Sequence, residues 1–261
     1  MPPCWPDASA RDDGLMATVM NEPRKTVVVT GASQGIGAGV AKRFAERGFN
    51  VVASARRMAE SSEIAPSDRV ATVDGDIGEA ATAARIVETA LSRFHSLDVL
   101  VNNAGVFVGK AFTDYTSQDI RRIFATNAEG VLYVTQLAIR QMLAQRTGGS
   151  IVTITAALAS NPVRGVNASV SMFTKGGLQT LTQHLAMEYA QDGIRVNAVA
   201  PGVVYTPLQH DSPKEAMERQ SPMGRPSTVE DITNAVMYLT DAPGVTGDIL
   251  YVDGGSHLGR W

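Results

Sequence analysis

Seven short runs rich in β-branched residues recur along this 261-residue chain, and helical patterns separate most of them. Short apolar runs bounded by turn residues are typical of strands that are buried on both faces of a sheet. The runs occupy residues 26–30, 51–55, 69–73, 98–101, 150–154, 194–200 and 248–252. Strands that alternate with helices predict an α/β protein with a doubly wound parallel sheet.

Apolar residues spaced three or four apart mark the helices between these strands. The patterns are Ile36, Val40 and Phe44; Ile86, Ala90 and Phe94; Ile120, Phe124, Val131 and Leu132; Leu178, Leu181 and Leu185; and Ile232, Val236 and Leu239. Thr116 with Asp119, and Ser227 with Glu230, have capping-box spacing ahead of two of these helices. The sequence therefore predicts helices that begin just after Thr116 and Ser227.

The length and the cysteine content of the chain limit how many domains and disulfides it can have. A chain of this length can bury the core of one sizeable domain, which we place at residues 24–261, and we expect residues 1–23 to form a disordered leader. No segment approaches the roughly 20 apolar residues of a membrane span. The single cysteine, Cys4, has no intrachain partner, and this fits a reducing, cytoplasmic location.

The charge balance argues against several classes of partner. The chain has 23 basic and 26 acidic side chains, so no excess of positive charge predicts binding to nucleic acid or to an anionic membrane. The four histidines, His95, His184, His210 and His257, have no metal-ligand spacing, and we predict no metal site. A small molecule is the expected partner.

Immediately after the first strand, the segment "TGASQGIG" places Gly31, Gly35 and Gly37 at the start of a helix. A turn without side chains lets the backbone approach a diphosphate, and a helix N-terminus offers free N–H groups to it. An isolated glycine pattern is more often a turn that binds nothing. The order strand, glycine turn, helix favours a dinucleotide site instead.

Two further motifs end predicted strands: "NNAG" at 102–105 and "VNAVAPG" at 196–202. Together with the glycine turn, this pattern resembles the classical short-chain dehydrogenase/reductase family from about residue 25 to 255. The resemblance implies a single-domain, Rossmann-type oxidoreductase that acts on a small carbonyl or alcohol and forms a homodimer or homotetramer. It implies that Asn103 holds neighbouring strands together, that residues 201–206 contact the nicotinamide, and that Asp76 and Ile77 touch adenine. The cofactor-binding residues it implies are Gly31, Ser33, Gln34, Gly35, Ile36, Gly37, Arg56, Asp76, Ile77, Asn103, Ala104, Gly105, Lys175, Pro201, Gly202, Val204 and Thr206.

The end of the second strand sets the preference between NAD and NADP, because a carboxylate there binds the ribose 2′-hydroxyl and a basic residue suits the 2′-phosphate. Ala55 occupies the acidic position, and Arg56 and Arg57 follow it. A guanidinium binds phosphate with two hydrogen bonds. We therefore predict NADP rather than NAD, although Gln34 stands where many NADP-binding relatives carry a second basic residue.

The family's proton donor is a tyrosine four residues before a lysine, supported by a serine after the fifth strand and an asparagine on the fourth helix. Asn127 and Lys175 match this pattern, whereas Ser171 stands at the tyrosine position and Ala156 at the serine position. None of the six tyrosines precedes a lysine by four residues. By resemblance, the candidate catalytic residues are therefore Asn127, Lys175 and Ser171.

Other groups could stand in for the missing tyrosine. Tyr205 lies in the turn that lines the nicotinamide pocket of relatives, but we favour its interpretation as an aromatic residue that packs the substrate loop. Thr155 is expected to point away from the site, because successive residues of a strand face opposite ways. Residues 210–227, with His210 and Asp211, have the composition of a mobile lid.

Two functions remain open on the sequence alone. The first is an NADP(H)-dependent oxidoreductase with an altered proton-donor site. The alternative is a catalytically inactive NADP(H)-binding scaffold or redox sensor.

Overall fold

The computed structural model describes residues 24–207 and 214–259. The predicted leader, and His210 and Asp211 of the predicted lid, lie outside the described residues.

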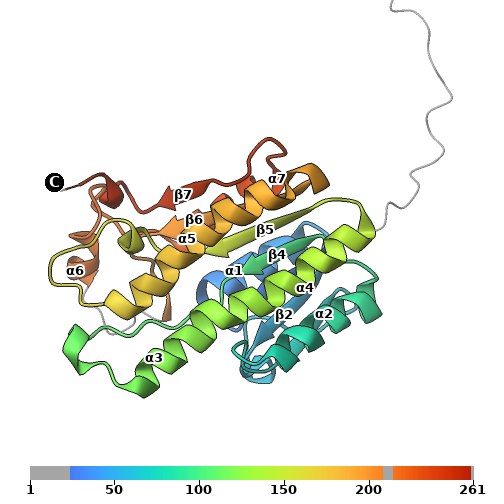
Figure 1. Ribbon diagram of the computed structural model, residues 1–261, viewed down its shortest axis with the longest axis horizontal. Coiled ribbons are helices and arrows are strands. Elements are labelled where there is room, and N and C mark those ends of the chain that lie inside the picture. Colours follow the sequence, from blue (N-terminus) through green and yellow to red (C-terminus); the bar gives the residue numbers. More distant parts are fainter. Residues whose placement is uncertain (1–23, 208–213, 260–261) are drawn as a thin grey trace, which may run out of the picture.

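A seven-stranded parallel sheet forms the centre of the molecule, as predicted (Figure 1). Its order is β3-β2-β1-β4-β5-β6-β7, so the chain leaves β1 toward one edge and then returns to build the other half from β4. This reversal places the switch point between β1 and β4, where doubly wound sheets bind ligands. The strands are β1 (Thr26–Thr30), β2 (Asn50–Ala55), β3 (Val70–Asp74), β4 (Val99–Asn102), β5 (Gly149–Ile154), β6 (Ile194–Pro201) and β7 (Ile249–Val252).

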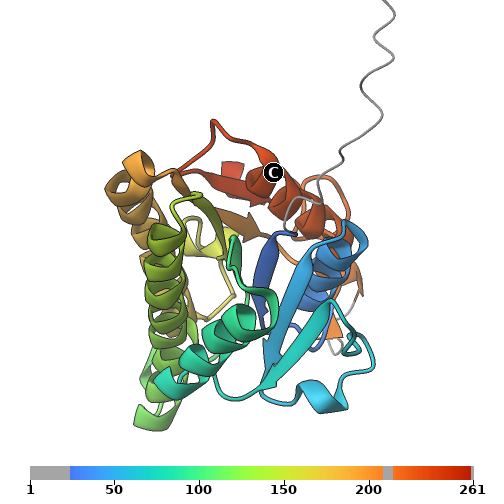
Figure 2. The same ribbon diagram turned by 90° about the vertical axis from the view of Figure 1, so that its right-hand side faces the viewer.

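Helices cover both faces of the sheet (Figures 1 and 2). Helices α2 (Ala80–Phe94), α4 (Gly130–Gln145) and α5 (Ser169–Tyr189) lie on one face, and α1 (Gly35–Glu46) and α7 (Val229–Asp241) lie on the other. Helix α3 (Ser117–Phe124) joins α4 through one π-helical turn (Ala125–Glu129), and the short helix α6 (Lys214–Glu218) precedes α7. Two 3₁₀ turns, η4 (Ala157–Ala159) and η7 (Ser256–Leu258), follow β5 and β7. Among the described residues, no helix has the length and apolarity to cross a membrane.

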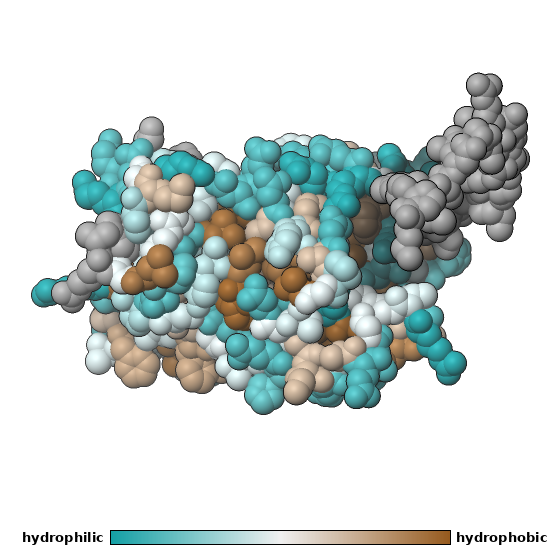
Figure 3. All heavy atoms as spheres, turned by 90° about the horizontal axis from the view of Figure 1, so that it is seen from above, coloured by the Kyte–Doolittle hydropathy of each residue, from teal (hydrophilic) through white to brown (hydrophobic). Residues whose placement is uncertain are grey.

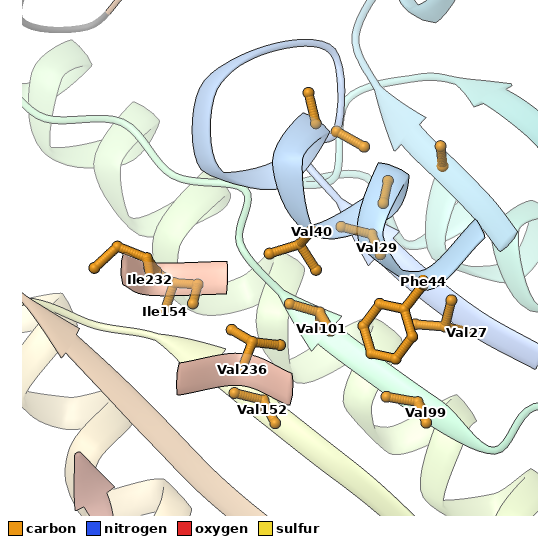
Figure 4. Packing of buried hydrophobic residues seen from close by; sticks show 14 of the residues in the cluster. Val27, Val29, Val40, Phe44, Val99, Val101, Val152, Ile154, Ile232 and Val236 are labelled. Carbon is orange, nitrogen blue, oxygen red and sulfur yellow. The ribbon is translucent and has the colours of Figure 1, made fainter. Parts of the chain in front are cut away.

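Alternation along the strands divides the core into two clusters. Val27 and Val29 of β1 point toward α1 and α7, whereas Val28 between them points to the other face. Figure 4 shows Phe44 of α1 packed near Val27 and Val99 in the first cluster. Phe44 is fully buried, and removal of such a ring costs roughly 3–5 kcal/mol. This packing fixes the first helix, and with it the glycine turn, on the sheet.

The two predicted capping boxes have different outcomes. Thr116 and Asp119 form the predicted box at the start of α3. At α7 the prediction was one residue too early, because Thr228 and Asp231 form the box in place of Ser227 and Glu230. The hydroxyl of Ser227 instead donates to the carbonyl of Val252 at 3.0 Å, which ties the start of α7 to β7.

Candidate active site

A cavity of about 910 Å³ lies across the carboxyl ends of the strands. Its walls are formed by the segments that follow β1 to β6, at residues 31, 33–36, 55–57, 75–77, 103–107, 155–158, 202–204 and 206–207. Ligand pockets commonly measure roughly 300–1,000 Å³. Every cofactor-binding residue expected from the sequence lines this cavity except Gly37, which is buried in the first turn of α1.

The glycine turn has the close backbone approaches that a diphosphate site needs. Gly31 has φ +66°, and a Cβ atom there would lie 2.8 Å from the Cα of Ala104. At Gly37 a Cβ atom would lie 2.3 Å from the carbonyl oxygen of Gly31, so side chains are excluded from both positions. The side-chain amide of Asn103 donates to the carbonyls of Thr30 and Gly31, both at 3.0 Å, and holds β1 and β4 together beside the turn.

The N-terminus of α1 differs from those of α3 and α7. The latter two begin with complete capping boxes, whereas the N-cap residue of α1, Gln34, makes no side-chain cap. Gly35 and Ile36 in the first turn of α1 line the cavity, and no side chain of the described residues caps this turn, which leaves its N–H groups available as they are where helix termini bind phosphate. These observations fit a dinucleotide whose diphosphate lies against α1.

Beyond the glycine turn, the end of β2 contributes positive charge. Arg56 and Arg57 are exposed and border the cavity, and Ala55 leaves no carboxylate at the end of the strand. Arg57 forms an ion pair with Glu60 at 3.2 Å, while Arg56 makes no ion pair within the described residues. Arg56 is therefore the guanidinium that is available to an anionic ligand.

At the opposite end of the cavity, Lys175 extends from α5 to the carbonyl of Ile154, to which its Nζ atom donates at 2.5 Å. Burial lowers the pKa of Lys175 from 10.5 to about 8. Gly105 lies beside this ammonium group, and a Cβ atom at Gly105 would be in ordinary van der Waals contact with Lys175 Nζ at 3.4 Å and with Asn127 Oδ1 at 3.5 Å. Lys175 and Asn127 thus converge on one backbone position after β4.

Asn127 lies in the π-helical turn between α3 and α4 and is fully buried. Its Oδ1 accepts from the N–H of Val106 at 2.8 Å, and its Nδ2 donates to the carbonyl of Val106 and to the hydroxyl of Thr174. Asn127 does not itself line the cavity. In this state it shapes the segment after β4, and π-helical turns of this kind are frequent at functional sites.

Ser171 lines the cavity, but its hydroxyl is engaged with the backbone of Val108. It accepts from the N–H of Val108 at 3.1 Å and donates to the carbonyl of the same residue at 3.3 Å. The phenol of Tyr115 donates to that carbonyl as well, at 2.6 Å. Ser171 therefore fastens the segment after β4 to α5.

Neither the family's serine position nor the other two residues considered as replacements for the tyrosine, Thr155 and Tyr205, offers a free hydroxyl to the cavity. Ala156 borders the cavity with a methyl group. Thr155 borders it too, although we expected this residue to lie away from the site, and its hydroxyl donates to the carbonyl of Val199 at 3.1 Å. Tyr205 is 37% exposed and is not among the residues that line the cavity.

Comparison with known proteins decides the family. A family profile described as enoyl-(acyl carrier protein) reductase matches residues 31–257. The chain belongs to the short-chain dehydrogenase/reductase family. As a member of this family, it is an NAD(P)-dependent oxidoreductase.

Two curated relatives cover nearly the whole domain. An uncharacterized oxidoreductase of Methylorubrum extorquens is 38% identical over 245 residues, which are 88% of this chain and 97% of the relative. L-Rhamnose 1-dehydrogenase (NAD(P)(+)) of a Sphingomonas species is 36% identical over 247 residues, with 90% and 96% of the two chains covered.

Among solved structures, the 3-ketoacyl-(acyl-carrier-protein) reductase of Brucella melitensis in complex with NADH superposes with a TM-score of 0.84. It is 33% identical to this chain, and the match covers 89% of this chain and 98% of the reductase. That structure holds a dinucleotide, NADH.

The structure also brings residues to the cavity that sequence reasoning did not select, among them Phe107, Arg122 and His257. His257 follows β7, and the rule that ligands bind at the carboxyl ends of strands could have identified it. No local motif marks it as a site residue. Within residues 24–207 and 214–259, no group of three or more His, Cys, Asp or Glu residues is arranged to hold a metal ion.

Proposed function

We propose that this protein is an NADP(H)-dependent oxidoreductase that acts on a small carbonyl or alcohol and delivers its proton without the tyrosine and serine of the family. The observation that carries the choice of NADP is the end of β2, where Arg56 is exposed, borders the cavity and makes no ion pair within the described residues. Asp or Glu is absent from position 55, so nothing there repels a 2′-phosphate.

When bound, NADPH would supply the hydride that the carbonyl carbon of a substrate takes up. Around it, Lys175 and Gly105 form the wall against which the nicotinamide ribose would lie, and Asn127 holds that wall in place through Val106. Residues 201–204 and 206, at the end of β6 and after it, also line the cavity. This arrangement positions reactants, and positioning alone can account for about 7–11 kcal/mol of a reaction barrier.

Proton delivery is the part of the reaction for which this chain departs from its family. A positioned general acid contributes roughly 10²- to 10⁴-fold to a rate. Ser171 would have to release the carbonyl of Val108 before its hydroxyl could face a substrate. That engagement favours the second candidate function, a cofactor-binding scaffold or redox sensor without turnover.

Cofactor choice is tested by titration of NADPH and NADH against Arg56→Ala. We expect the variant to lose affinity for NADPH much more than for NADH, because only NADPH has the 2′-phosphate. Arg57→Ala is the matched control, since its guanidinium already pairs with Glu60, and it should have the smaller effect. Equal losses of both cofactors in Arg56→Ala would contradict the NADP assignment.

Turnover separates the two candidate functions. We expect wild-type protein to consume NADPH faster than solution controls with at least one member of a broad carbonyl panel. The double variant Ser171→Tyr with Ala156→Ser restores the residues of the family at both positions. Activity that appears only in the double variant would show that the wild type lacks a functioning donor and would support the scaffold or sensor.

Self-association is a further part of the proposal. Phe173 on α5 is 69% exposed and Leu132 on α4 is 47% exposed, on the face of the sheet that these helices cover. Figure 3, seen from above relative to Figure 1, shows apolar side chains gathered in the centre of the face on the β7 side, with polar residues around them. Strand β7 is the edge of the sheet. Exposed apolar faces and an open strand edge favour a homodimer or homotetramer.

A further inference from the structure

The last turn of the described chain carries an aspartate–histidine pair at the cavity. Ser256 and His257 of η7 line the cavity, and Asp253 directly follows β7. Asp253 packs against Gly202, where a Cβ atom would lie 2.8 Å from the Cβ of Asp253. The N–H of Gly202 donates to Val252 at 3.1 Å. The pair therefore sits beside the segment that we expect to contact the nicotinamide.

Asp253 holds the imidazole of His257 in one orientation. Nδ1 of His257 lies 3.0 Å from both carboxylate oxygens of Asp253. The carboxylate also accepts from the hydroxyl of Ser256 at 2.8 Å and from the backbone N–H groups of Gly255 and His257. Burial raises the pKa of Asp253, but hydrogen bonds from His257 and Ser256 outweigh it and leave the pKa below its usual value. Asp253 is thus an ionised carboxylate that can stabilise an imidazolium.

Tyr251 packs against one face of the His257 imidazole. The two rings stack with their centroids 4.1 Å apart and an interplanar angle of 18°. Nε2 of His257 makes no hydrogen bond to any described residue, and the His257 side chain keeps 27% of its surface exposed. A ring that is held at Nδ1 and stacked on one face presents its remaining nitrogen to solvent or to a ligand.

The pair lies next to the position where the family has its serine. Turn η7 packs against η4, which begins one residue after Ala156. The phenol of Tyr251 donates to the hydroxyl of Ser160 at 2.9 Å, and this hydroxyl donates to Gln179 at 2.8 Å. The amide of Gln179 donates to the carbonyl of Ala156 at 3.3 Å. Packing and hydrogen bonds therefore connect His257 and Tyr251 to the end of β5, where Ala156 stands in place of the family's serine.

We propose that His257, oriented by Asp253, is the residue that exchanges a proton with the substrate oxygen. This inference rests on the proposed oxidoreductase function. In the reductive direction, the carbonyl carbon takes the hydride of the bound reduced cofactor, and the carbonyl oxygen takes the Nε2 proton of the His257 imidazolium. The products are an alcohol, oxidised cofactor and a neutral imidazole hydrogen-bonded to Asp253. Alcohol oxidation is the reverse.

A second hollow gives the imidazole a further route by which to recover its proton. His257 also lines a second hollow of about 380 Å³, together with Tyr251, Arg225 and Asp231. Arg225 pairs with Asp231 at 2.8 Å, so these two charged groups bind each other and not the imidazole of His257. Water in this hollow would connect His257 to bulk solvent.

The first test is chemical rescue. His257→Ala should lower the turnover of the best carbonyl of the panel by roughly 10²-fold or more while NADPH affinity stays unchanged. Added imidazole should restore much of the loss, because it can occupy the vacated space and donate the proton. His184→Ala, at an exposed position of α5, is the matched control and should behave as wild type with and without imidazole.

The second test has a readout other than turnover. Diethyl pyrocarbonate modifies accessible imidazoles, and peptide mass spectrometry reports His257 and His184 separately. The best carbonyl of the panel, added with oxidised cofactor, should slow modification of His257 and leave that of His184 unchanged. His257→Asn provides a second variant in case His257→Ala fails to bind NADPH.

The outcomes separate this inference from the function on which it rests. A wild type that turns over, with full activity in the His257 variants, overturns the inference and leaves the oxidoreductase function standing. Activity lost without imidazole rescue, or no protection of His257, also overturns it. A wild type that binds NADPH but turns over no carbonyl or alcohol overturns the proposed function, and the inference with it.

Discussion

Lys175 enters the cavity from the second turn of α5, and burial of its ammonium group costs free energy in the ligand-free protein. The pKa is lowered from 10.5 to about 8, which corresponds to at most about 3.4 kcal/mol. The cavity leaves the side chain partly open to water, and water screens part of this cost. A charge at this position is retained at the expense of stability, as is common where a residue serves a ligand.

The pH dependence of unfolding tests this cost in Lys175→Met. Between pH 8 and 10.5 the unfolded chain binds a proton at Lys175 that the folded protein has lost, so the stability of the wild type rises with pH in this window. The variant has no such contribution. We expect it to be more stable than wild type at pH 7 and to lose that advantage as the pH approaches 10.5. Urea unfolding of both proteins from pH 7 to 10.5 measures the difference, and a constant difference would contradict the buried charge.

The elements show why part of the site could be predicted and part could not. The strands follow from their β-branched runs, with bounds within a residue or so, because a parallel sheet buries both faces of each strand. The cap of α7 could not be placed by spacing alone, since Ser227 with Glu230 and Thr228 with Asp231 present the same pattern one residue apart. In the structure the hydroxyl of Ser227 bonds to β7, and Thr228 is left to cap the helix.

The same limit applies to the residues of the site. The strand–glycine–helix order predicts the cofactor end because backbone geometry there is set by neighbours in the sequence. His257 owes its place to Asp253, Tyr251 and the packing of η7 on η4, and contacts between distant segments leave no local pattern.

At the other end of α7, Arg195 of β6 supplies the C-terminal cap. Its guanidinium donates to the carbonyls of Leu239 at 2.6 Å, Thr240 at 2.5 Å and Val245 at 3.3 Å. A cation near the C-terminus of a helix also complements its dipole. Arg195 therefore ties α7 to the sheet from the end opposite the capping box.

Arg195→Met should destabilise the protein by roughly 2–4 kcal/mol, because the carbonyls of Leu239 and Thr240 lose their guanidinium donor, whereas the carbonyl of Val245 keeps the amide of Asn197. Arg195→Lys keeps one donor group and the positive charge, so its stability should lie between those of Arg195→Met and the wild type. Thermal or urea unfolding measures the order of the three proteins. A methionine variant as stable as wild type would show that water replaces the guanidinium without cost.

For the whole molecule, the apolar side chains left on the surface raise the question of how many copies associate. Phe173 contacts Phe124 with ring centroids 5.7 Å apart, yet most of its surface remains exposed. A single chain gains little from such a residue, whereas a second copy seated on α5 would bury it.

Light scattering of the eluted protein tests this assignment. We expect wild type to have the mass of a dimer or tetramer and Phe173→Asp to shift toward a smaller species, because a carboxylate would be desolvated in the interface. NADPH titration of the variant checks that the site remains folded. A wild type with the mass of one chain would contradict self-association.

The hold that Ser171 has on Val108 has a consequence for how such a chain can change over time. A tyrosine at position 171 would give up both hydrogen bonds to the Val108 backbone, each of which contributes about 1 kcal/mol. Ser171→Tyr alone would thus loosen the segment after β4, and the tyrosine would still lack the supporting serine at position 156. For a protein with serine at position 171, the first of the two substitutions is therefore expected to lower stability. We expect such proteins to keep the proton-delivery chemistry that they have.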